Sequence, residues 1–272
     1  MAQGLCPKDE HFGHNAAMPY PRPAIPAEIK RAVRQRCGFG CVICGNPFVE
    51  YDHLLGWAET ERHVADELTL LCVQHHGEKT RGLLSGDDVA KANRDPFNMR
   101  GEWSAPYALN YGSRPVKFIL GTNTFEAPRS PWFIAVKVDS TTILGFRFER
   151  GVCLVKVRLF DADGAKVLEI LDNEVVFAAG AWDVEFVANR LTIRRAMGAV
   201  VLALTFDVPG HRLLITKLDM VYKGYEIQAD SRRLTVSGFT FVGASVVGPV
   251  GVMVGDVPEC QSSGNIFIGG AA

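Results

Sequence analysis

Two short pairs of metal-ligating residues stand out in the first third of the chain. Cys41-Val-Ile-Cys44 places two thiolates three positions apart, and Cys72-Val-Gln-His75 repeats that spacing with a thiolate and an imidazole. Two such pairs can turn onto one ion, and four soft ligands are typical of a closed tetrahedral zinc site. Thiolates also favour Zn²⁺ over hard cations. The sequence therefore predicts a structural zinc site formed by Cys41, Cys44, Cys72 and His75.

The cysteine count supports this interpretation. The chain has seven cysteines, and four of them fall between positions 37 and 72. A disulfide-stapled secreted domain would usually show an even number spread through a short chain, so metal binding is the better interpretation. Cys37 competes for a ligand position, although its distance of four residues from Cys41 fits less well. The alternative is a group of buried free cysteines that happen to lie near one another.

Residues suited to acid–base chemistry accompany the two pairs. Asp52 and His53 lie between the pairs, and His76 directly follows the second pair. Neighbouring side chains on a helix point about 100° apart, so His76 must face elsewhere than His75. Neighbouring side chains on a strand point to opposite faces. Asp52 and His53 can therefore serve one site only if their strand is twisted or lies at an exposed edge.

This segment resembles the HNH endonuclease family, whose fold is the ββα-metal finger. The resemblance covers about residues 29–85 and rests on three linked motifs, at residues 41–45, 51–54 and 67–80. It implies a small zinc-stabilised domain that hydrolyses phosphodiester bonds in DNA with the help of a second, catalytic metal ion.

The resemblance also implies roles for single residues. His53 would be the general base that activates water, which suits a neutral imidazole. Asp52 and His76 would hold the catalytic divalent cation, which we expect to be Mg²⁺, Mn²⁺ or Ni²⁺. The zinc site would use His75 where many members of the family carry a cysteine.

One position departs from the family's pattern. The family's middle Asn, which helps to orient the base histidine, is replaced here by Glu67. The carboxylate of Glu67 could orient His53 in the same way and raise its basicity, or the change could mark a weakened site. His63, in the intervening loop, could contact substrate or metal, or it could be an ordinary surface histidine.

Basic residues flank the same segment. Residues 27–36 predict a short amphipathic helix, with Arg31 and Arg34 away from its apolar face. Lys79 and Arg81 follow the second ligand pair. We expect these four cations to contact the phosphates of a nucleic acid, whereas the alternative is a solvated basic surface.

The pattern changes near residue 113. Apolar or alternating runs of strand length recur there between turns rich in Gly, Asn and Asp, and residues 152–170 predict a hairpin. We predict an α+β protein with a poorly ordered, proline-rich leader over residues 1–26. The zinc-stabilised finger and its linker would occupy residues 27–112, and an all-β sandwich or solenoid residues 113–272. Acidic clusters in the β domain, such as Asp183-Val-Glu185, are interpreted mainly as solvated turns.

Composition limits the possible functions. The 272 residues are 47% hydrophobic, which allows a sizeable core, and 29 Lys and Arg against 30 Asp and Glu give a net charge of −1. Tight non-specific DNA binding through charge alone is therefore not expected, so the cations must cluster locally or the β domain must mediate self-association. No apolar run is long enough to cross a membrane and no secretory signal is apparent, so we expect a cytoplasmic protein.

These observations favour an HNH endonuclease acting on DNA, by analogy a bacterial defence or restriction effector. The alternative is a catalytically weakened, zinc-organised module that binds DNA or protein, with a β domain for ligand sensing or oligomerisation. A third reading assigns the main activity to the β domain.

Overall fold

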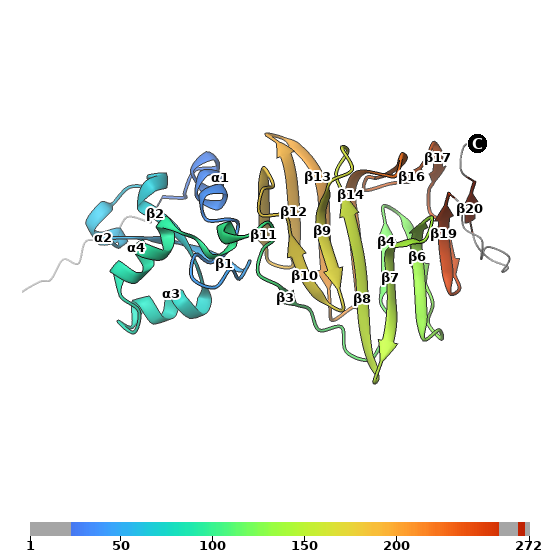
Figure 1. The fold of residues 1–272 in the computed structure, drawn as a ribbon, viewed down its shortest axis with the longest axis horizontal. Coiled ribbons are helices and arrows are strands. Elements are labelled where there is room, and N and C mark those ends of the chain that lie inside the picture. Colours follow the sequence, from blue (N-terminus) through green and yellow to red (C-terminus); the bar gives the residue numbers. More distant parts are fainter. Residues whose placement is uncertain (1–22, 256–265, 270–272) are drawn as a thin grey trace, which may run out of the picture.

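The computed structural model describes residues 23–255 and 266–269. Most of the expected leader, residues 1–22, lies outside this part. Figure 1 shows a small helical unit at one end of the molecule and a larger two-layered β domain beside it. The protein is thus mixed α+β with mostly β structure, as expected. No helix among the described residues is long and apolar enough to cross a membrane.

The helical unit contains a two-stranded sheet and four α-helices. Its elements are α1 (Ala27–Arg36), β1 (Val49–His53), α2 (Trp57–Thr60), η1 (Ala65–Glu67), β2 (Leu68–Cys72), α3 (Val73–Thr80), α4 (Gly86–Arg94) and η2 (Phe97–Arg100). Strands β1 and β2 are antiparallel, with Val49 opposite Cys72 and His53 opposite Leu68. The chain passes from β2 directly into α3, which gives the order β1, β2, α3. We refer to this unit as the finger.

The apolar faces of these elements form the small core of the finger. Val33 of α1, Leu68 and Leu70 of β2 and Val89 of α4 are fully buried together. Helix α1 begins and ends where the apolar periodicity predicts it. Ser85 precedes helix α4 and caps it, because its hydroxyl accepts a hydrogen bond from the backbone N–H of Asp88 at 3.1 Å.

The β domain consists of two packed sheets. One sheet has the strand order β20-β19-β6-β7-β8-β9-β10-β3, and the other is built on the path β11-β12-β13-β14-β15-β16-β17 with β4, β5 and β18 attached. The strands are β3 (Tyr107–Ala108), β4 (Lys117–Leu120), β5 (Asn123–Glu126), β6 (Trp132–Val138), β7 (Thr141–Glu149), β8 (Val152–Phe160), β9 (Lys166–Leu171), β10 (Glu174–Phe177), β11 (Asp183–Val187), β12 (Arg190–Ala196), β13 (Ala199–Asp207), β14 (Arg212–Tyr222), β15 (Tyr225–Ala229), β16 (Leu234–Val236), β17 (Phe239–Phe241), β18 (Ser245–Val247), β19 (Val250–Val254) and β20 (Ile266–Ile268).

Residues from both sheets share one hydrophobic core. Phe133 and Leu159 of the first sheet and Leu204 and Ile215 of the second are buried in the same cluster. Neighbouring strands along the chain pair mostly as antiparallel hairpins, including β8 and β9, which form the hairpin expected over residues 152–170. The architecture is therefore a sandwich, and the solenoid alternative does not apply.

The connection between the two units adds to the β domain. Strand β3 pairs with β10, and Trp103 forms a bridge with Ala178. Strand β3 and Trp103 both precede residue 112, where we expected the finger and its linker to end. The connection is thus partly a sheet edge, which fixes the end of the finger against the β domain.

A buried ion-pair network joins the finger to the β domain. Arg34 of α1 donates from Nε and Nη2 to the two carboxylate oxygens of Asp183 at 2.8 Å each, and from Nη1 to Glu185 at 3.0 Å. The same Nη1 donates to the hydroxyl of Tyr51 at 2.8 Å. Arg34 and Asp183 are only 7% and 1% exposed. Arg34, which we expected to contact nucleic acid, is thus paired with carboxylates of the β domain, and Asp183 lies in this buried network and not in a solvated turn.

We predict that Asp183→Asn destabilises the protein by about 3–5 kcal/mol, because it leaves the buried charge of Arg34 without its main partner. Urea unfolding followed by fluorescence and circular dichroism measures this effect. Arg147→Gln is the matched control: Arg147 also has carboxylate partners, but its side chain is 49% exposed, and such pairs contribute about 0–1 kcal/mol. Equal effects of the two substitutions would contradict this account of the interface.

Candidate metal centre and adjoining acid–base residues

Four side chains of the finger converge as the sequence predicts. One ligand atom from each of Cys41, Cys44, Cys72 and His75 lies within 4.8 Å of all the others. The Sγ atoms of Cys44 and Cys72 are 3.8 Å apart, and Cys72 Sγ lies 3.2 Å from His75 Nδ1. A tetrahedron with Zn–S bonds of about 2.3 Å has S···S edges of about 3.8 Å. This cluster could hold a metal ion and is compatible with structural zinc.

The backbone places these ligands by tight turns at the end of the sheet. Gly45 adopts a φ of 75° after Cys44, and its N–H donates to the carbonyl of Cys41 at 2.7 Å. Glycine accommodates this left-handed conformation without strain. Cys72 ends β2 and His75 lies in the first turn of α3. The second ligand pair therefore spans a strand-to-helix junction.

Burial makes the Cys44 thiol of the cluster a weak acid. Burial raises the pKa of the Cys44 thiol to about 12, and the neighbouring Cys41 and Cys72 contribute in the same direction. A divalent metal ion bound here would stabilise the thiolate form and lower this pKa. Cys37 is buried but lies outside the cluster, with its Sγ 3.7 Å from Asn93 Oδ1.

A second group of polar side chains lies where β1 meets α3. His76 Nε2 is 3.4 Å from Asp52 Oδ1, and the other ring nitrogen, Nδ1, pairs with the carboxylate of Glu50. Glu50 and Asp52 are two positions apart on β1 and share one face of it. The Asp52 side chain is mostly buried, whereas His76 is more exposed. The structure thus brings together the two residues expected to hold a catalytic cation.

Lys79 completes this group. Its ammonium pairs with Asp52 Oδ2 and donates to the carbonyl of His53 at 2.7 Å. We expected Lys79 to contact a flanking phosphate. The structure differs, because the side chain of Lys79 turns inward and neutralises Asp52.

The His53 side chain is almost completely buried beside a different set of groups. Its Nε2 lies 3.2 Å from the carbonyl oxygen of Arg62, which accepts a hydrogen bond from the ring. Its ring packs against Trp57 and His63, with centroid distances of 5.2 and 5.4 Å. This hydrogen bond and the two ring contacts hold the His53 imidazole in place.

Glu67 forms an ion pair with Arg62. Its carboxylate accepts hydrogen bonds from the guanidinium of Arg62, at 3.1 Å from Nε, and these bonds are the main reason that the pKa of Glu67 is lowered. The charge of His53 contributes in the same direction. Because the carbonyl of the same arginine holds His53, Glu67 can orient the histidine through the backbone of residue 62.

The other two cations lie apart from this group. Arg31 stacks over the ring of Trp182 at 5.1 Å, beside the β domain. Arg81 follows α3 and is exposed, with no carboxylate within 4.0 Å among the described residues. Of the four cations predicted to contact phosphate, Arg31 and Arg81 therefore have no carboxylate partner among the described residues.

Three residues of this region escaped the sequence analysis. Glu50 and Arg62 hold His76 and His53, and Asn98 is fully buried behind the first ligand turn. The Asn98 amide donates to the carbonyls of Gly38 and Gly45, at 2.9 and 3.1 Å. Glu50 could have been found from the sequence, because it lies two positions from Asp52 on the same predicted strand. No local pattern marks the other two.

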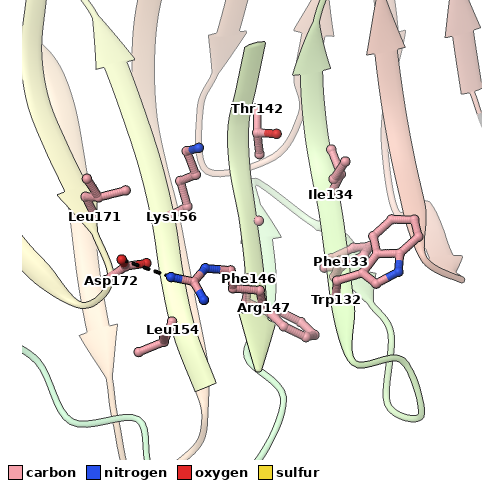
Figure 2. A pocket seen from close by; sticks show the side chains of 11 residues that line it. Trp132, Phe133, Ile134, Thr142, Phe146, Arg147, Leu154, Lys156, Leu171 and Asp172 are labelled. Atoms are coloured by element: carbon pink, nitrogen blue, oxygen red, sulfur yellow. Dashed lines mark hydrogen bonds and ion pairs between the residues drawn. The ribbon is translucent and has the colours of Figure 1, made fainter. Parts of the chain in front are cut away.

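A separate hollow of about 420 Å³ lies on the eight-stranded sheet. Figure 2 shows Trp132 on one side of it and Leu171 on the other, with Lys156 and Arg147 between them. Arg147 pairs with Asp172 at 3.1 Å. The other charged residue of the lining is Lys156.

We predict that each chain binds one zinc ion tightly and that Cys72→Ser loses it. The melting temperature of this variant should also be lower, because the ligands join segments that the small finger core does not otherwise fix. Inductively coupled plasma mass spectrometry and thermal unfolding measure both effects. Metal release should become easier as the pH falls, because protons compete for the thiolates. Cys37→Ala is the control, and it should retain the metal. Full zinc content in Cys72→Ser would refute the assignment.

Comparison of the chain with protein families, with curated proteins and with solved structures found no match.

Proposed function

We propose that this chain is a metal-dependent endonuclease that hydrolyses phosphodiester bonds in DNA, with catalytic residues on β1 and α3. The observation that carries the proposal is the 3.4 Å approach of His76 to Asp52 on the unit that also holds the Cys/His cluster. The motif resemblance over residues 41–80 supports it from the sequence. In this proposal zinc in the cluster is structural.

The donor set around Asp52 suits a divalent cation. One carboxylate and one imidazole leave most coordination positions to water and to phosphate oxygens, as is usual for Mg²⁺, and the imidazole also suits Ni²⁺. Bound there, the cation would stabilise negative charge on the phosphate and on the leaving oxygen. Glu50 accepts a hydrogen bond from His76 Nδ1, which directs Nε2 towards Asp52.

His53 supplies the general base in this scheme. A proton would move from water to the imidazole of His53 while the water oxygen forms a bond to phosphorus. The bond between phosphorus and the leaving sugar oxygen breaks, and that oxygen takes a proton from solvent. The products are a phosphate monoester and an alcohol. Glu67 and Arg62 are positioning residues, because they act through the ring of His53.

One observation favours a second candidate function, a zinc-organised module without catalysis. The ammonium of Lys79 already neutralises Asp52, so a metal ion must displace it or bind beside it. If Lys79 does not yield, the finger would bind DNA or protein without cleaving it. A plasmid-nicking assay distinguishes the two functions.

We predict that the zinc-loaded protein nicks supercoiled plasmid DNA when Mg²⁺, Mn²⁺ or Ni²⁺ is added. His53→Ala should lower the rate by about 10²–10⁴, the usual contribution of a general base. His76→Ala should weaken the dependence on added metal ion as well as the rate. Agarose gel electrophoresis over a time course measures both.

His211→Asn is the matched control for the histidine variants. His211 lies in a turn of the β domain with a φ of 51°, which asparagine tolerates. This variant should nick at the wild-type rate. Equal inactivity of all proteins with every metal would overturn the nuclease and support the binding module.

A further inference from the structure

A crevice of about 320 Å³ lies at the junction of the finger and the β domain. Helix α1 forms one wall, and β11 and β12 with the turn after β12 form the other. Its lining combines the apolar side chains of Ile25, Trp182 and Met197 with four cations. Crevices between domains are common places for small-molecule sites, which usually measure about 300–1,000 Å³.

Two of the four cations are neutralised within the protein. Arg34 and Arg194 both donate to Asp183 and Glu185, with distances of 2.8 to 3.0 Å. Two guanidinium groups and two carboxylates thus form a closed and neutral network. Neither carboxylate has capacity left to balance a further positive charge.

The remaining two cations, Lys30 and Arg31, give the crevice a surplus charge of +2. Among residues 23–255 and 266–269, no carboxylate oxygen lies within 4.0 Å of either. Each lies over an aromatic ring instead: Lys30 over Tyr51 at 5.8 Å and Arg31 over Trp182 at 5.1 Å. A stacked guanidinium keeps its in-plane N–H groups available for a bidentate contact with phosphate.

We propose that this crevice binds a small phosphate monoester with a ring-bearing organic part, of the nucleoside monophosphate class. Such a phosphate carries a charge of about −1.5 to −2 at neutral pH, which matches the two uncompensated cations. The organic part would lie against Ile25, Trp182 and Met197. A nucleic acid backbone fits less well, because neutralising several phosphates requires a longer run of cations than two.

A ligand in this crevice should stabilise the docking of the finger on the β domain. It would contact α1 and the β domain together, and Arg34 of the same lining also donates to Tyr51, the residue before Asp52. A ligand that binds only the docked arrangement stabilises it by mass action. Binding should therefore raise the melting temperature. This site does not depend on the proposed nuclease activity.

Isothermal titration calorimetry with AMP on the zinc-loaded full chain, without added divalent metal, tests the proposal. AMP should bind, whereas adenosine should not at the same concentration. Lys30→Gln and Arg31→Gln should each weaken AMP binding roughly tenfold or more, the usual effect of removing a charged hydrogen bond, and the double variant should abolish it. Lys91→Gln, on the exposed face of α4, removes the same charge elsewhere and should bind as the wild type.

Zinc content and circular dichroism establish whether each variant is folded. If the double variant does not fold, the two single variants still test the proposal. Absence of AMP binding at millimolar concentration, or unchanged binding by the folded variants, would overturn the proposal. A third arm uses a 20-base-pair DNA duplex. Binding of the duplex but not of AMP, lost in Lys30→Gln and Arg31→Gln, would also overturn it and would assign these cations to a DNA backbone.

Discussion

The convergence of three sulfurs and one imidazole is the constraint on which the finger depends. Its own apolar core is small, and the ligands come from a tight turn and from a strand-to-helix junction that lie far apart in sequence. An ion that joined them would fix the end of β2 and the start of α3. His76 follows the last ligand directly, so the same junction sets its distance from Asp52 on β1.

The interface with the β domain imposes a second constraint on the same strand. Arg34 is held by two carboxylates of β11 and in turn holds the hydroxyl of Tyr51, which lies between Glu50 and Asp52. A buried charge of this kind tolerates few alternative arrangements, because each would leave a charge unpaired. The sandwich therefore holds the finger through this network, and the crevice between them carries the surplus positive charge of Lys30 and Arg31.

Local patterns predicted much of the fold and part of the candidate site. Equal spacing within two ligand pairs identified all four members of the Cys/His cluster, and alternating apolar residues identified several strands of the β domain, including the hairpin over residues 152–170. The carboxylate partners of Arg34 and Lys79 were not foreseen, for one reason. A cation on a polar helix face looks the same whether it meets solvent or a carboxylate, and the partners of Arg34 lie 149 and 151 residues further along the chain.

The most direct test of the central claim is the anomalous diffraction of crystals of the zinc-loaded protein soaked in Mn²⁺. The account predicts two separate metal positions: zinc within the Cys/His cluster, and manganese in contact with Asp52 and His76 after the ammonium of Lys79 has moved aside. Manganese absent from the second position while Lys79 stays on Asp52, or zinc absent from the cysteines, would contradict a finger that holds two ions of different character.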